Sequence, residues 1–326
     1  MKNLSQDPVN EIAVPNIENA SHEDECNYYN QVKEIRKLQY PEFNDRLGKL
    51  EIKYATEISL LKQNGFVKLE NVLDISQIDK TFKSMDEMIE NGHGVIPPRD
   101  LRKFKENSEI DHMQLPRIRS EDLKKGSDFL RKATNTVDIQ DPLKSIPSIL
   151  SLALDEQILD LINAYCGCLT SLGYVKFRRS YANDFPLYDT NYYHYDGGTI
   201  RPIRVFIYLK DVDESTGPFC FVKGSHAKKF DGWRDRTRWS YEEMVELYGE
   251  ENLIRMTAQK GDLIIADNAG YHAAVKPISK DRNALLLTYL IHEEYEGGPP
   301  CGYKLIDTEF FNDYQKSSLY LLAAEN

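Results

Sequence analysis

The chain has 326 residues, of which 29% are charged and 41% are hydrophobic, and its formal net charge is −11. This length can bury one large domain with an appendage, or two domains, and the composition is that of an ordinary globular protein. The negative charge argues against a nucleic-acid partner that binds through bulk electrostatics. No apolar run approaches the roughly 18–20 residues that span a bilayer, so we expect no membrane-embedded segment.

The N-terminal part of the chain is polar. Residues 1–50 carry acidic runs and few regularly spaced apolar positions, which predicts a flexible or loosely docked extension before a domain over 51–326. The first residues lack the continuous apolar stretch of a signal peptide. The five cysteines are scattered, and Cys166 and Cys168 lack a second pair at zinc-binding spacing. We therefore expect reduced thiols in a cytoplasmic protein.

Two helices are indicated before the middle of the chain. Asp74 is placed to cap a helix whose apolar residues recur at helical spacing over 75–89, and Gly92 is placed to end it. A second helix is predicted over about 155–165. The charged, proline-interrupted segment 93–145 predicts loops with short helices.

Short strands dominate the chain after residue 169. Gly, Pro, Asp and Asn bound them, and this spacing predicts an antiparallel sandwich or barrel rather than alternating strands and helices. Including one early strand, the predicted strands are 66–69, 172–177, 204–209, 219–222, 263–266 and 284–290. An insertion at about 228–256 interrupts them with a helix that starts after Ser240 and stops at Gly249.

A His-x-Asp pair lies between the predicted strands. His194 and Asp196 are two residues apart, so on an extended chain they point the same way and can bind one ion. A histidine from a distant strand would complete a two-histidine, one-carboxylate triad, which leaves three coordination positions free on Fe(II). His22 and His292 also begin His-x-acid sequences, but only His194 has strands on both sides and aromatic neighbours.

His272 is the expected third ligand because it follows the buried strand 263–266. Ten residues further on, Arg282 begins the next apolar strand, which an antiparallel arrangement brings back beside the metal. A guanidinium can bind a carboxylate through two parallel hydrogen bonds. We therefore expect Arg282 to hold the distal carboxylate of 2-oxoglutarate.

These motifs together resemble the phytanoyl-CoA dioxygenase family. The motifs are the His-x-Asp pair, the following strand with its acidic turn 211–219, and Gly224-Ser225-His226, where Lys223 replaces the family's usual proline. Residues 63–73 are similar to the family's opening, and 261–282 to its second half. The likeness covers roughly residues 55–295.

The resemblance implies a mainly β fold with flanking helices, the double-stranded β-helix or cupin-like jelly roll. It also implies that Fe(II), 2-oxoglutarate and O2 are required, and that an aliphatic C–H is hydroxylated with release of succinate and CO2. Desaturation or ring closure remain open as outcomes. Because Asp196 is an acid, the resemblance disfavours a function like that of the family's halogenating relatives. The resemblance also implies that His226 has a structural role, because the family's histidine at this position is mostly structural.

Further site residues are predicted around the triad. Lys176 and Arg178 share one face of a strand, and either could touch the keto-acid end of 2-oxoglutarate. Asp267 and Asn268 either orient His272 or close the turn before it.

Four residues are candidates for contact with the substrate. Tyr192 is the tyrosine of its segment expected to face the pocket, and Arg201 lies shortly after it. Trp233 and Trp239 belong to the basic and aromatic part of the insertion, which is either a solvated loop or a lid for an anionic or sugar-like substrate.

The expected partner is a small-molecule substrate, with no nucleic acid and no membrane. Its identity is not indicated by the sequence, and neither is the oligomeric state. One alternative is a jelly-roll binding protein that has lost turnover. Another is a metalloenzyme of the cupin type that works without 2-oxoglutarate and without Arg282.

Overall fold

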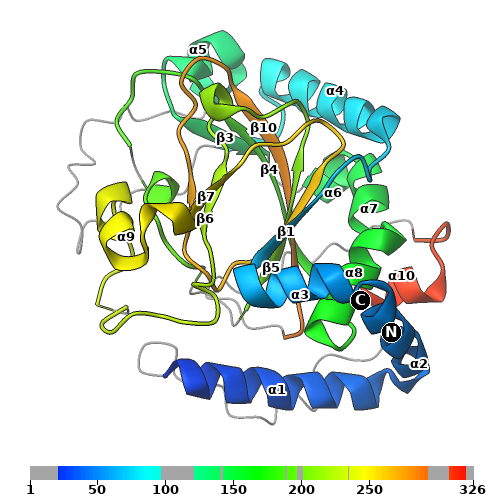
Figure 1. The fold of residues 1–326 in the computed structure, drawn as a ribbon. Helices are drawn as coiled ribbons and strands as arrows, with labels where there is room; N and C mark the ends of the chain where they lie inside the picture. Colours follow the sequence, from blue (N-terminus) through cyan, green and yellow to red (C-terminus); the bar gives the residue numbers. More distant parts are fainter. Residues whose placement is uncertain are drawn as a thin grey trace.

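The computed structural model describes residues 21–96, 121–139, 142–187, 189–196, 201–233, 235–292 and 308–320. Two antiparallel sheets face each other in a jelly roll, which confirms the predicted fold class (Figure 1). The large sheet has the order β1-β8-β5-β10-β4-β3-β2, and the small sheet has the order β7-β6-β9. The strands are β1 Phe66–Leu69, β2 Val95–Ile96, β3 Thr136–Ile139, β4 Ser171–Ser180, β5 Ile203–Tyr208, β6 Phe219–Val222, β7 Leu253–Met256, β8 Leu263–Asp267, β9 His272–Ala274 and β10 Arg282–Leu290.

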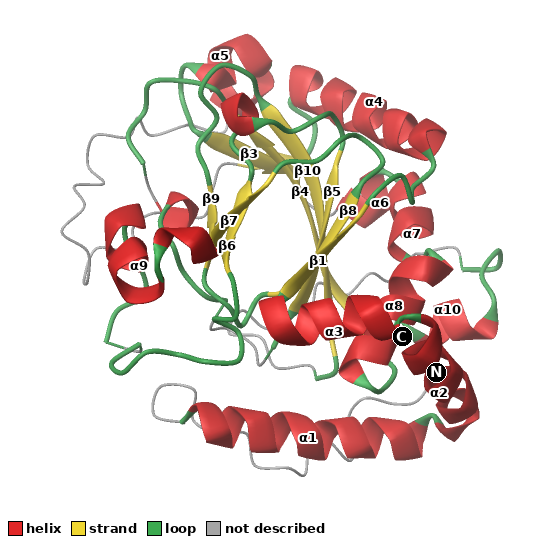
Figure 2. Cartoon of the chain, viewed as in Figure 1, coloured by secondary structure: helices red, strands yellow, loops and turns green. Residues whose placement is uncertain are grey.

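Helices cover the face of the large sheet that points away from the small sheet (Figure 2). The described helices are α1 His22–Gln39, α2 Asn44–Lys53, α3 Ala55–Asn64, α4 Ile75–Asn91, α5 Ser127–Arg131, α6 Pro142–Ser145, α7 Ser148–Ala153, α8 Glu156–Cys166, α9 Tyr241–Tyr248 and α10 Asp313–Ser317. Of these, α9 lies on the other side, next to the small sheet (Figure 2). None of these helices is both long and apolar enough to cross a bilayer, among the residues described. One face of the large sheet is thus left for the small sheet and the space between them.

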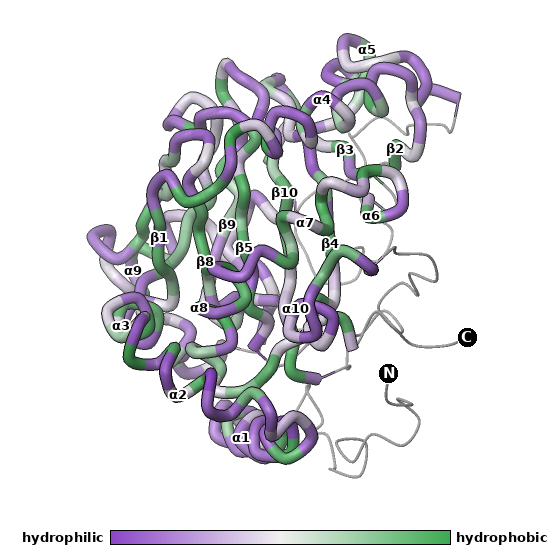
Figure 3. The backbone as a smooth tube through the Cα atoms, turned by 90° about the vertical axis from the view of Figure 1, so that its right-hand side faces the viewer, coloured by the Kyte–Doolittle hydropathy of each residue, from purple (hydrophilic) through white to green (hydrophobic). Residues whose placement is uncertain are grey.

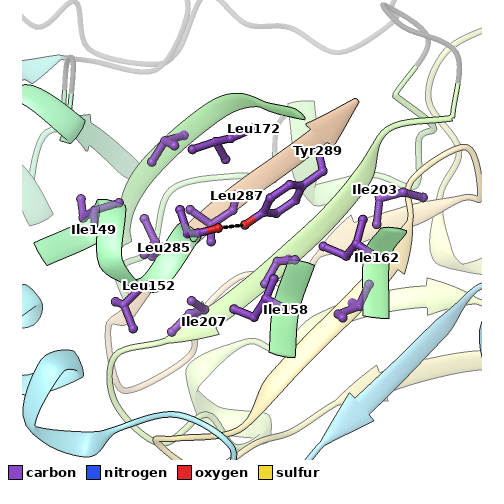
Figure 4. Close-up of a cluster of buried hydrophobic side chains, with 14 of the residues drawn as sticks. Ile149, Leu152, Ile158, Ile162, Leu172, Ile203, Ile207, Leu285, Leu287 and Tyr289 are labelled. Atoms are coloured by element: carbon purple, nitrogen blue, oxygen red, sulfur yellow. Dashed lines mark hydrogen bonds between the residues drawn. The ribbon is translucent and has the colours of Figure 1, made fainter. Parts of the chain in front are cut away.

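The alternation of side chains along the large sheet creates two cores. On the helix side, Leu285, Leu287 and Tyr289 of β10 pack against residues of α7 and α8 (Figure 4). On the inner side, Phe206 of β5 packs with Phe219 of the small sheet. Figure 3 shows hydrophobic stretches in the central strands of the large sheet, such as β8 and β5. Residues between those of the helix-side core therefore point into the jelly roll.

The predicted helices are confirmed together with their ends. The side chain of Asp74 accepts a hydrogen bond from the Ser76 amide at 2.8 Å, and Gly92 ends α4 in the left-handed conformation at φ 65°. Asp155 caps α8 in the same way. Ser240 begins α9 with a reciprocal capping box.

The N-terminal segment differs from its prediction. Residues 22–50 are largely helical and packed on the protein, so a flexible or loosely docked extension is wrong for this part. Tyr28, Tyr29 and Val32 of α1 are buried, and Arg36 donates from Nε to the carbonyl of Ile291 at 2.8 Å. Tyrosine and arginine carry long apolar surfaces under a polar tip, so a polarity count does not reveal this packing.

Several short strands were not predicted. These are β2, β3, β7 and β9, and none has more than four residues. Their pairing partners, not their own composition, hold them in the sheets: β9, for example, pairs with β6 through Phe219, Cys220 and Phe221. Residues 97–120 of the predicted loop region lie outside the described residues.

The cysteines fit the prediction of thiols. Cys26, Cys166, Cys168 and Cys220 are free, and the last three are buried. Burial raises the pKa of Cys166 to about 11, so this thiol stays protonated and inert at neutral pH. The close pair 166–168 is therefore part of the core.

The hydroxyl of Tyr289 should contribute measurably to stability. It donates to the carbonyl of Ala153 at the end of α7, at 2.5 Å in a buried setting (Figure 4). Replacing Tyr289 by Phe leaves this carbonyl unpaired and should lower the free energy of unfolding by about 1–3 kcal/mol in urea titrations. The control is Tyr241→Phe, whose hydroxyl bonds Glu250 at the surface and should cost under about 0.5 kcal/mol. Equal effects of the two substitutions would contradict this account.

Candidate metal centre

Three ligand residues converge at one end of the jelly roll. The ligand atoms of His194, Asp196 and His272 all lie within 4.8 Å of one another. Asp196 Oδ1 is 3.9 Å from Nε2 of His194 and 3.7 Å from Nε2 of His272. The two imidazole rings have centroids 4.3 Å apart. This is the only such group of three among the residues that the structure describes.

Backbone pairing brings the distant histidines together. The amide of His194 donates to the carbonyl of His272 at 2.9 Å, and the amide of His272 donates back to the carbonyl of His194 at 2.8 Å. The amide of Asp196 then donates to the carbonyl of Asn268 at 3.2 Å. The His-x-Asp segment is therefore fixed to the chain that carries the third ligand.

Both imidazoles are oriented through their other ring nitrogen. Nδ1 of His194 lies 2.9 Å from the carbonyl of Tyr192, and Nδ1 of His272 lies 3.0 Å from the carbonyl of Gly270. A carbonyl only accepts, so we assign the proton to Nδ1 in each ring. Nε2 is then the unprotonated nitrogen of each ring, which is the form that binds a metal.

The charges of the three residues suit a metal site. Burial lowers the pKa of both histidines, to about 4 for His272, so both imidazoles are neutral at pH 7. Burial alone would raise the pKa of Asp196, but Arg204 and the two histidines hold it well below its ordinary value. Two neutral nitrogen donors and one carboxylate are the forms in which these residues bind metals.

The outer oxygen of Asp196 is held by two side chains. Arg204 Nη2 lies 2.8 Å from Asp196 Oδ2, and Asn268 donates from Nδ2 to the same oxygen at 3.0 Å. Oδ1 is left facing the histidines. Asn268 was expected either to orient His272 or to close the turn before it, and its Nδ2 lies 3.3 Å from His272 Nε2. The sequence analysis did not predict a role for Arg204 at the site. The only feature that could have indicated one is a charged residue at the start of an apolar strand.

Arg282 lies at the start of β10, opposite Ser180 of β4. Its side chain is buried, with the residue 7% exposed. It donates to the carbonyl of Val275 at 2.9 Å and to the Ser180 hydroxyl at 3.3 Å, and no described residue offers it a carboxylate. Burial, together with the nearby charge of Arg178, lowers its pKa to about 10, so it remains charged at neutral pH. A buried cation with only neutral partners fits an anionic ligand.

Lys176 and Arg178 project from β4 on the same face as Ser180, toward the inside of the jelly roll. Arg178 binds Asp138 through Nε at 2.7 Å and Nη2 at 2.8 Å. Lys176 Nζ is 3.9 Å from the same carboxylate. Their contact with 2-oxoglutarate remains a prediction.

The four predicted substrate residues lie around the triad in different settings. Tyr192 is partly buried and supplies the carbonyl that orients His194. Arg201 instead forms an ion pair with Asp267, at 2.7 Å. Contact of these two residues with a substrate stays a prediction.

The two tryptophans pack around the segment that carries the first two ligands. Trp239 is 2% exposed, and its ring centroid lies 4.9 Å from that of Tyr271. Trp233 packs edge-on against Tyr195, also with 4.9 Å between centroids. The structure thus places Trp239 in the core behind the site, and a lid function of the insertion remains a prediction.

The other histidines that the structure describes lie outside the three-residue group. His226 is buried and packs against Gly65, where an added Cβ would come within 2.6 Å of its Nδ1. His292 lies against Tyr28, whose hydroxyl is 2.9 Å from its Nδ1. His22 begins α1.

A jelly roll that holds two histidines and one carboxylate at one end has the donor set of non-haem Fe(II) oxygenases. A family model described as Phytanoyl-CoA dioxygenase (PhyH) matches residues 61–284, and the chain belongs to this family. The expected cofactors are therefore Fe(II) and 2-oxoglutarate.

Solved structures share the fold at low sequence identity. The epimerase SnoN, in complex with Fe3+, alpha ketoglutarate and nogalamycin RO, has 14% identity and a TM-score of 0.51, over 74% of this chain and 84% of that chain. EctD from S. alaskensis, with 2-oxoglutarate and 5-hydroxyectoine, has 16% identity and a TM-score of 0.48, over 72% and 75%. HygX from Streptomyces hygroscopicus, with nickel, 2-oxoglutarate and hygromycin B, has 15% identity and a TM-score of 0.46, over 72% and 85%. A comparison with curated proteins found no match.

The ion pair beneath the site should make stability depend on pH. Burial alone would raise the pKa of Asp267, but Arg201 holds it below its ordinary value. A lowered folded-state pKa stabilises the fold above the unfolded pKa, near 4, and this contribution is lost as the pH falls toward the folded value. Asp267→Asn should therefore lower the free energy of unfolding by about 3 kcal/mol at pH 7.

Urea titrations at pH 7 and below pH 4 measure this effect. The difference between Asp267→Asn and the unsubstituted protein should shrink at the lower pH. The control is Asp128→Asn, which alters an exposed ion pair with Arg131 and should change stability by under about 0.5 kcal/mol. A difference that does not change with pH would contradict the assignment to the ion pair.

Proposed function

We propose that this dioxygenase hydroxylates an aliphatic C–H of a small metabolite, with His194, Asp196 and His272 as the iron ligands and Arg282 as the clamp for 2-oxoglutarate. The observation that carries the proposal is the convergence of the three ligand atoms within 4.8 Å. The free thiols of the core fit the reducing interior of a cytoplasm.

The residues present fit ferrous iron. Two imidazole nitrogens and one carboxylate oxygen are the donor set of non-haem Fe(II) oxygenases, and they leave positions for a co-substrate and oxygen. Arg282 supplies the second half of the fit, because its buried guanidinium has a carbonyl and a hydroxyl as partners but no described carboxylate. The distal carboxylate of 2-oxoglutarate would compensate this charge.

When bound, iron and 2-oxoglutarate supply the activation of oxygen that removes hydrogen from a C–H bond, with release of succinate and CO2. The residues of the chain position and shield these groups. Arg204 and Asn268 hold Asp196 with Oδ1 toward the two histidines. Phe219 packs beside His272, with ring centroids 5.6 Å apart, and keeps water from that side of the ligand. Lys176 and Arg178 are proposed to lie near the keto-acid end.

A small metabolite is the substrate class that the site favours. The reacting group must enter a space between two sheets, which suits a small molecule better than a folded macromolecule. The epimerase SnoN, which has a similar fold, is in complex with the small molecule nogalamycin RO. The net charge of −11 does not favour a nucleic acid.

Removing one ligand should abolish metal binding. His272→Ala should weaken Fe(II) binding at least about 100-fold, since even outer partners of metal ligands are worth 10–100-fold in affinity. Anaerobic calorimetry with Fe(II) measures the dissociation constant. The control, His226→Ala, removes a buried histidine outside the group and should retain one bound metal per chain. Unchanged metal binding in His272→Ala would exclude this site.

Replacing the clamp should affect the co-substrate and not the metal. Arg282→Ala should raise the dissociation constant of 2-oxoglutarate at least about 30-fold, because a buried charge-paired contact is worth 2–5 kcal/mol. Arg282→Lys should fall between, since an ammonium cannot form the two parallel hydrogen bonds. Calorimetry of the Fe(II)-loaded variants under anaerobic conditions measures both values. If Arg282→Ala bound 2-oxoglutarate as the unsubstituted protein does, another residue would be the clamp.

A further inference from the structure

Several buried polar atoms beside the candidate metal centre have no hydrogen-bond partner; Oδ1 of Asn268 is an acceptor, and two others are donors on neighbouring strands. These two donors are Nε of Arg204 and the hydroxyl of Thr288, among the described residues. Thr288 is 1% exposed, and the side chain of Arg204 is 15% exposed. A buried donor without a partner is costly, and such groups in a site commonly await a ligand.

These two groups are neighbours on the inner face of the large sheet. The register pairs Arg204 of β5 directly with Thr288 of β10, and directly paired residues have Cβ atoms about 5 Å apart. Figure 4 shows the adjacent residues Leu287 and Tyr289 in the helix-side core, so Thr288 points the opposite way, into the jelly roll. Arg204 is anchored there by its contact of 2.8 Å with Asp196.

The pair lies toward the other end of β10 from Arg282. Arg282 contacts the carbonyl of Val275, three residues after His272. Arg204 instead reaches Asp196, which Asn268 binds four residues before His272. Along β10, Arg282 and Thr288 are six residues apart, which is roughly 20 Å in a strand. A 2-oxoglutarate molecule that reaches from the metal to Arg282 leaves Arg204 and Thr288 to a different ligand.

The charges at the site indicate what kind of ligand this is. Ferrous iron carries two positive charges, Asp196 one negative, 2-oxoglutarate two negative and Arg282 one positive, so these four cancel. Arg204 then adds a positive charge that nothing else among these groups balances. An anion brought by the substrate would restore neutrality in this buried space.

We propose that Arg204 and Thr288 form an oxyanion subsite, and that the substrate of this enzyme carries a carboxylate or a phosphate monoester that binds there. The Nε–H of Arg204 and the hydroxyl of Thr288 both donate to the oxyanion. This places the anionic group beside Arg204, next to the ligand Asp196, and so determines which carbon faces the metal. The inference rests on the proposed function, because it takes 2-oxoglutarate to occupy the side of Arg282.

The test uses three probes of similar shape and different charge: isovalerate, isobutyl phosphate and the neutral isovaleramide. Each is titrated into the protein loaded anaerobically with Fe(II) and 2-oxoglutarate, and its dissociation constant is measured by NMR. At least one oxyanion should bind about tenfold or more tightly than isovaleramide. The comparison of the two oxyanions shows whether the subsite takes a carboxylate or a phosphate.

Two variants assign the binding to the pair. Thr288→Val keeps the shape and removes the hydroxyl, so it should weaken the preferred oxyanion about tenfold, leave isovaleramide unchanged and leave the 2-oxoglutarate constant within twofold. Thr288→Ser keeps the hydroxyl and should retain the oxyanion affinity. The valine variant should unfold at an equal or higher urea concentration, because it removes an unpaired buried hydroxyl, so loss of fold cannot produce the result.

Two results would overturn the subsite. One is equal affinity for the neutral and anionic probes, and the other is a Thr288→Val variant that weakens 2-oxoglutarate instead of the probe. Absence of 2-oxoglutarate binding in the unsubstituted protein is a separate result, which contradicts the proposed function. In that case titrations with Fe(II) alone still compare Thr288→Val with the unsubstituted protein, and an unchanged oxyanion affinity there also overturns the subsite.

Discussion

The reciprocal backbone pairing of His194 with His272 is the interaction on which the rest of the site depends. Two hydrogen bonds of 2.8–2.9 Å join segments 78 residues apart in the chain and place both imidazoles over one point. The other contacts of the site orient the ligand atoms of residues that this pairing holds close together. Carbonyls of the same two segments turn Nε2 inward, and Arg204 with Asn268 turns Oδ1 of Asp196 the same way. A metal site in this fold is therefore mainly a consequence of strand pairing.

That dependence explains how much of the site could be predicted. The His-x-Asp spacing, the strand before His272 and the arginine ten residues later are local features, and together with the family resemblance they indicated the three residues that converge. Arg204 is different, because its role arises only from the register of β5 against its neighbours. A charge at the start of a strand has no meaning in the sequence until the strand beside it is known. Arg201, three residues earlier, carries the same charge but lies beside Asp267.

The fold, like the site, was predictable where local sequence features determine it and not where strand pairing does. Long strands such as β10 and capped helices such as α4 follow from composition and spacing, whereas β9, with three residues, exists because β6 pairs with it. The N-terminal helix was not predicted because most of its buried residues are tyrosines and an arginine. Figure 3 shows α1 as predominantly hydrophilic, although Val32 and Arg36 are almost completely buried. Polarity alone does not distinguish a solvated helix from one held by amphipathic side chains.

The contact between Arg36 and Ile291 has a consequence for the boundaries of this protein. Both residues lie outside the matched family range 61–284, yet they tie α1 to the chain just beyond β10. Arg36 also lies over the ring of Tyr320, with 4.5 Å to the centroid, so one guanidinium links three regions beyond that range. The packed unit of this protein is therefore larger than the segment that the family model matches. A fragment cut at residues 61 and 284 would keep every metal ligand and Arg282, but it would lose α1 and residues 285–290 of β10, the middle strand of the large sheet.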